Sequence, residues 1–139
     1  MQNPSAEHQK LVNEAINFFT QNGFIILEVD NNPQFPTPNQ HGKYRPDIVM
    51  KSADELLHIV EAKTSNDLYS LTTKEEFLNF SNRIMSSNSP NSPILVANKP
   101  VPFHIIVYKI DLQKLNNILR ELNLLYLINT RIFVHWYEE

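Results

Sequence analysis

The chain has 139 residues, 42% of them hydrophobic, which fits one globular domain over residues 1–139 and gives no indication of a second core. It carries 12 Lys and Arg against 15 Asp and Glu, a formal net charge of −3, so a phosphate-binding surface would have to be local. The absence of cysteine excludes disulfides and thiolate metal sites, and no apolar run approaches the ~20 residues of a membrane span, so we expect a cytoplasmic protein without membrane contact.

The N-terminal part of the chain predicts a helix, a strand and a long loop. Ser5 is a favourable N-cap for a helix that ends near Gln21, with Gly23 placed to terminate it. One face of this helix is apolar, at Leu11, Val12, Ala15, Ile16, Phe18 and Phe19. Residues 24–29 then predict a strand. The stretch 30–44 is rich in Pro and Asn, and long irregular loops of this kind often carry function.

The remainder of the chain predicts a hairpin followed by alternating helices and strands. The hairpin strands are Pro46–Met50 and Leu56–Lys63, joined by a polar turn. The later elements are a helix over about 72–86, strands over 94–97 and 103–110, a helix capped by Asp111, and a strand over 131–137. The order αβββαββαβ predicts an α/β fold with a mixed central sheet flanked by helices.

The hairpin carries charged residues where a buried strand pair is expected. Asp47 opens one apolar run, and Glu61 and Lys63 close the other. Glu61 and Lys63 share a face because strand side chains alternate, and antiparallel pairing sets Asp47 opposite or diagonal to Glu61, roughly 4.5 to 8 Å away. Buried charges are costly unless they are paired or hold a metal. Lys63 therefore either forms a structural salt bridge with Asp47 or Glu61, or belongs to a functional site.

These residues resemble a nuclease motif. Pro46-Asp47 followed by Glu61-Ala62-Lys63 looks like the signature of the PD-(D/E)XK nuclease superfamily, and each half occurs once in the chain. The resemblance covers about the first 97 residues. It implies a restriction-endonuclease-like αβββαβ core, here with a C-terminal β-α-β extension. The helix after the hairpin lacks the Gln found in some branches of the superfamily.

The resemblance also implies a metal site and a reaction. Asp47 and Glu61 would bind Mg²⁺, with Mn²⁺ as a substitute, and the carbonyl of Ala62 would be a further ligand. The first helix of the family often supplies another carboxylate, for which Glu14 is the candidate and Glu7 the reserve. The expected function is Mg²⁺-dependent endonucleolytic hydrolysis of DNA. The alternative is a catalytically inactive nucleic-acid-binding or assembly module on the same fold.

Two further sets of residues bear on the same function. In the implied mechanism Lys63 orients the attacking water and offsets charge on the phosphoryl oxygens. Lys43, Tyr44 and Arg45 form a basic patch with an aromatic neighbour, which either grips DNA or is an ordinary solvated loop.

Other site types find little support in the sequence. The five histidines are scattered without a short-spaced metal-binding pair, and His58 is expected in the core on the face opposite Glu61. Two glycines are too few for a phosphate-cradling loop. The apolar strands of the C-terminal third either extend the sheet or form an interface, and analogy with the family makes a homodimer plausible.

Overall fold

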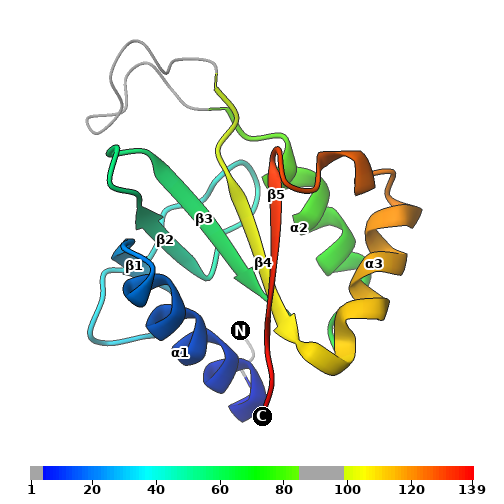
Figure 1. Ribbon diagram of the computed structural model, residues 1–139, viewed down its shortest axis with the longest axis horizontal. Helices are drawn as coiled ribbons and strands as arrows, with labels where there is room; N and C mark the ends of the chain where they lie inside the picture. Colours follow the sequence, from blue (N-terminus) through cyan, green and yellow to red (C-terminus); the bar gives the residue numbers. More distant parts are fainter. Residues whose placement is uncertain (1–4, 85–98) are drawn as a thin grey trace.

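Helices cover both faces of a single five-stranded sheet in the computed structural model, which describes residues 5–84 and 99–139 (Figure 1). The strands lie in the order β1-β2-β3-β4-β5, with antiparallel pairing from β1 to β3 and parallel pairing from β3 to β5. The elements are α1 (Ala6–Gln21), β1 (Ile25–Val29), β2 (Ile48–Lys51), β3 (Leu57–Ala62), α2 (Leu71–Ser81), β4 (Phe103–Tyr108), η2 (Lys109–Asp111), α3 (Leu112–Glu121), η3 (Leu125–Leu127) and β5 (Ile132–Tyr137). The predicted mixed α/β fold is therefore confirmed.

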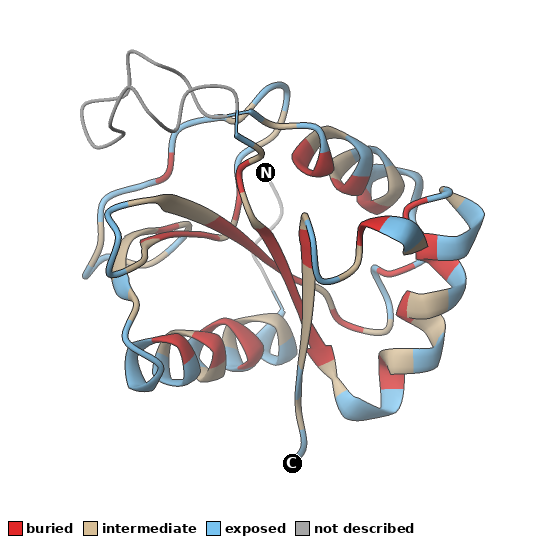
Figure 2. Cartoon of the chain, turned by 45° about the horizontal axis from the view of Figure 1, so that its top comes forward, coloured by how far each residue is buried: buried red, intermediate tan, exposed pale blue. Residues whose placement is uncertain are grey.

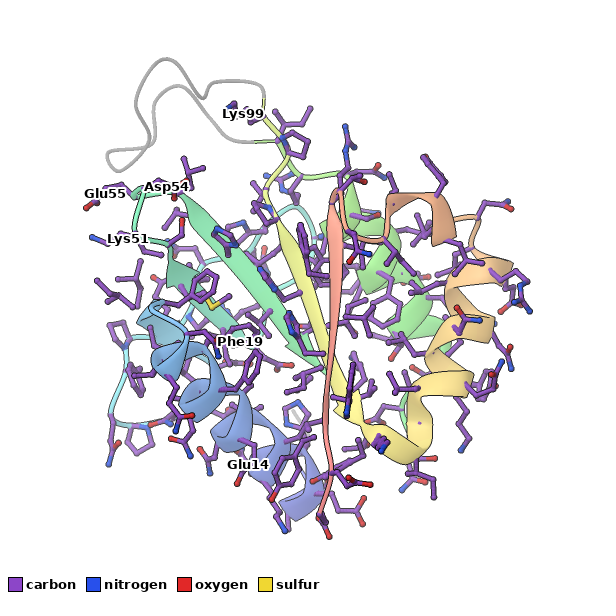
Figure 3. All side chains as sticks on the ribbon, viewed as in Figure 1. Glu14, Phe19, Lys51, Asp54, Glu55 and Lys99 are labelled. Carbon is purple, nitrogen blue, oxygen red and sulfur yellow. The ribbon has the colours of Figure 1, made fainter. Side chains whose placement is uncertain are left out.

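The first helix forms where the sequence predicts it. The Ser5 hydroxyl accepts a hydrogen bond from the His8 N–H at 3.1 Å, which satisfies a free donor at the start of α1. After the helix, Gly23 has a φ of +89°, a conformation that favours glycine. Phe19 is buried between α1 and the strands (Figure 3), whereas Phe18 is 43% exposed at the margin of the apolar stripe.

Two apolar clusters fix the helices to the sheet. One cluster joins α1 to the even-numbered side chains of the central strands, at Ile48, Met50, Val60, Ala62 and Ile106. The other joins α2 and α3 to the opposite face, at Val49, Ile59, Phe103, Ile105 and Val107. Figure 2 shows the buried residues concentrated in β3 and β4, at the centre of the sheet. Strand alternation therefore gives each face its own helix layer.

The strand predicted over 94–97 lies outside the described residues. The described elements after the hairpin differ from the sequence prediction in three respects. α2 ends at Ser81, before its predicted end. The strand that pairs with β3 is β4, so this strand belongs to the centre of the sheet and not to a C-terminal extension. Asp111 does lie at the N-cap of α3, but its side chain makes no capping hydrogen bond. Among the described residues no helix is both long and apolar enough to span a membrane.

Candidate functional site

The candidate site lies where β2 and β3 separate. Their pairing ends at Ile48 opposite Val60, and the Asp47 N–H donates to the Val60 carbonyl at 3.1 Å. Two residues further along β3, the Ala62 N–H donates to Asp47 Oδ2 at 2.8 Å. The Asp47 carboxylate thus accepts the hydrogen bond that a main-chain carbonyl of β2 would accept if the strand pairing continued. The Asp47 N–H also donates to Glu61 Oε1 at 2.9 Å. Asp47 and Glu61 are thus adjacent across the fork, as the antiparallel register predicts.

Lys63 lies beside two glutamates on the α2 face of the sheet. Its ammonium is 3.5 Å from Glu61 Oε2 and 2.7 Å from Glu76 Oε1. The side chain of Glu61 is only 2% exposed, and those of Lys63 and Glu76 are 13% and 12% exposed. This confirms that Glu61 and Lys63 share a face, and it shows that Lys63 forms the salt bridge to Glu61 that the sequence allowed, as a buried pair. Sequence reasoning missed Glu76. The sequence feature that could have indicated it is its position next to Phe77, a buried residue of α2.

From α1 it is His8 that reaches the fork, whereas Glu14 forms no hydrogen bond or ion pair with the described residues there. His8 Nε2 donates to Asp47 Oδ2 at 3.3 Å, and His8 Nδ1 is buried without a hydrogen-bond partner among the described residues. Burial alone would lower the pKa of His8, but the hydrogen bond and charge of Asp47 outweigh it and raise the pKa. Glu14 lies six residues further along α1, about 9 Å along the helix axis, and forms no ion pair within 5–84 and 99–139. The carbonyl of Glu7, the reserve candidate, accepts a hydrogen bond from the Tyr108 hydroxyl at 2.8 Å.

Carboxyl groups outnumber the basic side chains at the fork. Asp47, Glu61 and Glu76 lie around the ammonium of Lys63 and the imidazole of His8. Burial, together with the charge of Asp47, raises the pKa of Glu61 well above its usual value. Burial would lower the pKa of Lys63, but Glu61 and Glu76 outweigh it and raise that pKa. A bound cation would relieve the excess of carboxylates.

The donor set at the fork suits a hard cation. Within 5–84 and 99–139 no three acidic or histidine side chains converge into a ready-made metal site. A cation would therefore rest on Asp47, Glu61 and water, and Mg²⁺ is commonly held by one or two carboxylates in this way. The carbonyl of Ala62 points to the same side of β3 as its N–H, toward the fork, because both groups of a strand residue share a direction. The charged side chains Lys51, Asp54 and Glu55 lie at the other, turn end of the hairpin (Figure 3).

The three residues of the predicted basic patch have different surroundings in the fold. Lys43 and Arg45 are exposed in the loop that leads to the fork. The Tyr44 hydroxyl, by contrast, donates to Glu75 Oε2 at 2.5 Å, and the ring packs against the apolar cluster beneath α2. The loop is further fixed by Asn79, whose Oδ1 accepts from the Lys43 N–H at 3.2 Å. Tyr44 thus anchors the loop, and the two cations remain accessible.

Three of the five histidines form a row on the α1 face of the sheet. His58 Nδ1 lies 2.9 Å from His104 Nε2, and His104 Nδ1 lies 2.9 Å from His135 Nε2. Burial, reinforced by the charges of His135 and His58, lowers the pKa of His104 to about 2. Residue spacing does not indicate this row, because its members come from β3, β4 and β5. As expected, His58 lies on the face opposite Glu61.

A cavity of 990 Å³ lies at the carboxyl ends of β4 and β5. Its lining includes Glu7, which precedes His8, and Ser65, which lies two residues after Lys63. The Lys114 ammonium contacts the Ser65 hydroxyl on the same wall. Crevices at the carboxyl ends of parallel strands are common ligand sites in open α/β sheets.

The described residues therefore bring Asp47, Glu61, Ala62 and Lys63 together and add His8 and Glu76, whereas Glu14 forms no hydrogen bond or ion pair there. Comparison of the chain with models of protein families, with curated proteins and with solved structures finds no match to any of them.

Proposed function

We propose that this chain is a Mg²⁺-dependent DNA endonuclease with a restriction-endonuclease-like core. The observation that carries the proposal is the meeting of Asp47, Glu61 and Lys63 at the fork between β2 and β3. The order α1, β1, β2, β3, α2, β4 agrees with the αβββαβ core of the nucleases that the sequence motif resembles. The agreement between motif, fold order and fork geometry supports this function over an isolated salt bridge.

The proposed cation would be held by Asp47, Glu61 and the Ala62 carbonyl. When bound there, Mg²⁺ would polarise a phosphodiester and make water more acidic. The fit rests on the chemistry of the fork: its donors are oxygens, and its carboxylates outnumber the nearby ammonium. Glu76 fixes the ammonium of Lys63 beside Glu61 through the 2.7 Å contact. Lys63 would then orient the attacking water and offset charge on the phosphoryl oxygens.

Lys43 and Arg45 would bind the DNA backbone next to the fork. Both are exposed, and the loop that carries them is tied to α2 by Tyr44 and Asn79. Phosphate contacts of this kind position a duplex without reading its sequence. Because the net charge of the chain is −3, such a local pair of cations matters more than the overall field.

The test is incubation of the purified protein with supercoiled, linear and branched DNA, in Mg²⁺ or Mn²⁺ and in EDTA. We expect metal-dependent cleavage of at least one substrate and its loss in EDTA. Lys63→Ala should slow cleavage by about 100-fold or more, as losses of single electrostatic groups do. Lys74→Ala is the matched control, because Lys74 also lies on α2 but pairs with Glu121 of α3 at 2.9 Å. Wild-type cleavage by a folded Lys63→Ala protein would refute the proposed role of the lysine.

A catalytically inactive DNA-binding module is the second candidate, and one observation favours it. Glu61 is almost fully buried, and Lys63 is held between two carboxylates, so both groups are already engaged. In that case no substrate is cleaved in either metal, whereas DNA binding through Lys43 and Arg45 persists. Fluorescence anisotropy of labelled DNA, run beside the cleavage assay, separates the two functions.

A further inference from the structure

Within the described part of the chain, the outer edge of β5 has main-chain groups without a hydrogen-bond partner. The Phe103 N–H donates to the Arg131 carbonyl at 2.9 Å, so the odd-numbered residues of β5 face β4. The Ile132 carbonyl faces the other way, where it accepts from the Asn129 N–H at 2.7 Å. The even-numbered residues of β5 therefore present their N–H and C=O groups to the outside of the sheet. Beyond Ile132 these residues are Val134 and Trp136.

The edge at β5 lacks the protection found at the other edge. In 5–84 and 99–139 no hydrogen bond to the main chain of Val134 or Trp136 is recorded on the outer side. At the opposite edge, β1 has a register irregularity between Ile26 and Glu28, and the Val29 N–H donates to Pro36 of the adjoining loop. β5 contains no proline, bulge or charged residue between its ends. Native proteins usually block such edges, so an open one indicates a strand partner.

A side chain and a groove on this edge complement each other. Trp136 is 55% exposed, and strand alternation puts it on the same face as Val134, toward α3. Beside Val134, a groove of 320 Å³ runs between α3 and β5. Its apolar lining comes from Leu112, Leu115, Leu119, Ile128 and Val134. An exposed indole beside an apolar groove on the same edge is what a self-complementary surface requires.

We propose that two copies of this chain pair antiparallel through β5, with Val134 opposite Trp136 of the partner subunit. In this register each outward N–H and C=O of Val134 and Trp136 gains a partner, because the two opposed residues exchange both hydrogen bonds. Opposed residues share a face, so Trp136 of the partner subunit lies over the groove beside Val134. The twofold axis makes the contact reciprocal, and the two sheets become one continuous sheet.

Charge complementarity at the ends of β5 selects the same register. Counting outward from Val134 and Trp136 sets Arg131 opposite Glu139 of the partner subunit. Glu139 contacts Lys10 at 3.1 Å within one copy, but both side chains are about half exposed, so this pair is easily exchanged. This edge therefore fits a second copy of the chain. The inference does not depend on the proposed hydrolysis of DNA.

Sedimentation velocity over a concentration series tests the proposal. We expect the wild-type chain to form dimers, and Trp136→Ala to weaken the dimer by at least about 10-fold, as loss of a central aromatic anchor does. Val134→Pro should have a similar effect while leaving the β4 pairing intact, because the lost N–H faces outward. Ile25→Ala is the matched control, since Ile25 is also 55% exposed but lies on the β1 edge, and it should leave the dimer unchanged.

Exchanging the charges of Arg131 and Glu139 provides a second test that leaves the strand residues of β5 unchanged. Arg131→Glu should weaken the dimer, and the double change Arg131→Glu with Glu139→Arg should restore it. Circular dichroism establishes that each variant is folded. A wild-type chain that stays monomeric over the whole series would overturn the proposal. A dimer unaffected by Trp136→Ala and by Arg131→Glu would do the same.

Discussion

Replacing Lys63 with methionine removes the one ammonium that lies between the buried carboxylates at the fork. The side chain of Lys63 is 13% exposed, with Glu61 and Glu76 at 3.5 and 2.7 Å. Breaking a buried ion pair by removing one partner costs roughly 3 to 5 kcal/mol. We expect a loss of about 3 kcal/mol, the low end, because the elevated pKa of Glu61 lets that carboxyl take up a proton.

The cost of Lys63→Met should depend on pH in a defined direction. The pKa of Glu61 is raised in the folded state above its usual value of 4.5, so its charge opposes folding increasingly as pH rises above 4.5. Without Lys63 this penalty grows. The destabilisation should therefore be largest near neutral pH and should shrink toward about pH 5, as the carboxyls become protonated.

Urea unfolding followed by circular dichroism, at both pH values, measures this cost. Lys74→Met is the matched control, because Lys74 and Glu121 are 26% and 56% exposed and such a pair contributes about 0 to 1 kcal/mol. Equal losses for the two variants would show that the pairing of Lys63 with Glu61 and Glu76 contributes no more than a surface ion pair. A loss for Lys63→Met that is the same at both pH values would contradict the raised pKa of Glu61.

Three further predictions concern metal, DNA and pH. Asp47→Asn should abolish Mn²⁺ binding in calorimetric titration without loss of folding, and unchanged affinity would remove the fork as a metal site. Joint replacement of Lys43 and Arg45 by glutamine should weaken DNA binding and flatten its salt dependence in fluorescence anisotropy, because fewer counterions are released. An unchanged slope would indicate that both residues belong to an ordinary solvated loop and do not contact DNA. The pKa values of His58, His104 and His135 are lowered from 6.5 by burial, so stability should fall as pH drops below 6.5. His104→Gln should reduce that slope in thermal melts, and an unaltered slope would contradict the role of the row.

Local signals in the sequence predicted the elements that build the fork. Ser5 and Gly23 mark the ends of α1 through capping and a positive φ, which depend on neighbouring residues alone. Alternation along the hairpin set Glu61 and Lys63 on one face, and the antiparallel register brought Asp47 to Glu61. These features need no knowledge of how distant elements pack.

The contacts that sequence reasoning missed all depend on packing between distant elements. Glu76 reaches Lys63 because α2 lies over this face of the sheet, and a helix pattern does not tell where along the sheet the helix will lie. The same uncertainty explains why His8 and not Glu14 meets Asp47. The row of His58, His104 and His135 requires the parallel register of three strands. Long connections join these strands, so the spacing of residues along the sequence does not predict that register.

Single-turnover cleavage of labelled DNA in Mg²⁺ by the wild-type chain and by Glu61→Gln tests most directly whether the fork is a catalytic metal site. This change removes one carboxylate from the fork and leaves a side chain of similar shape beside the Asp47 N–H. Because burial opposes the charge of Glu61, the variant should stay folded. If Asp47, Glu61 and Lys63 form a metal-dependent site, its cleavage rate should fall by about 100-fold or more. Cleavage by Glu61→Gln at the wild-type rate would contradict a metal-dependent site at the fork.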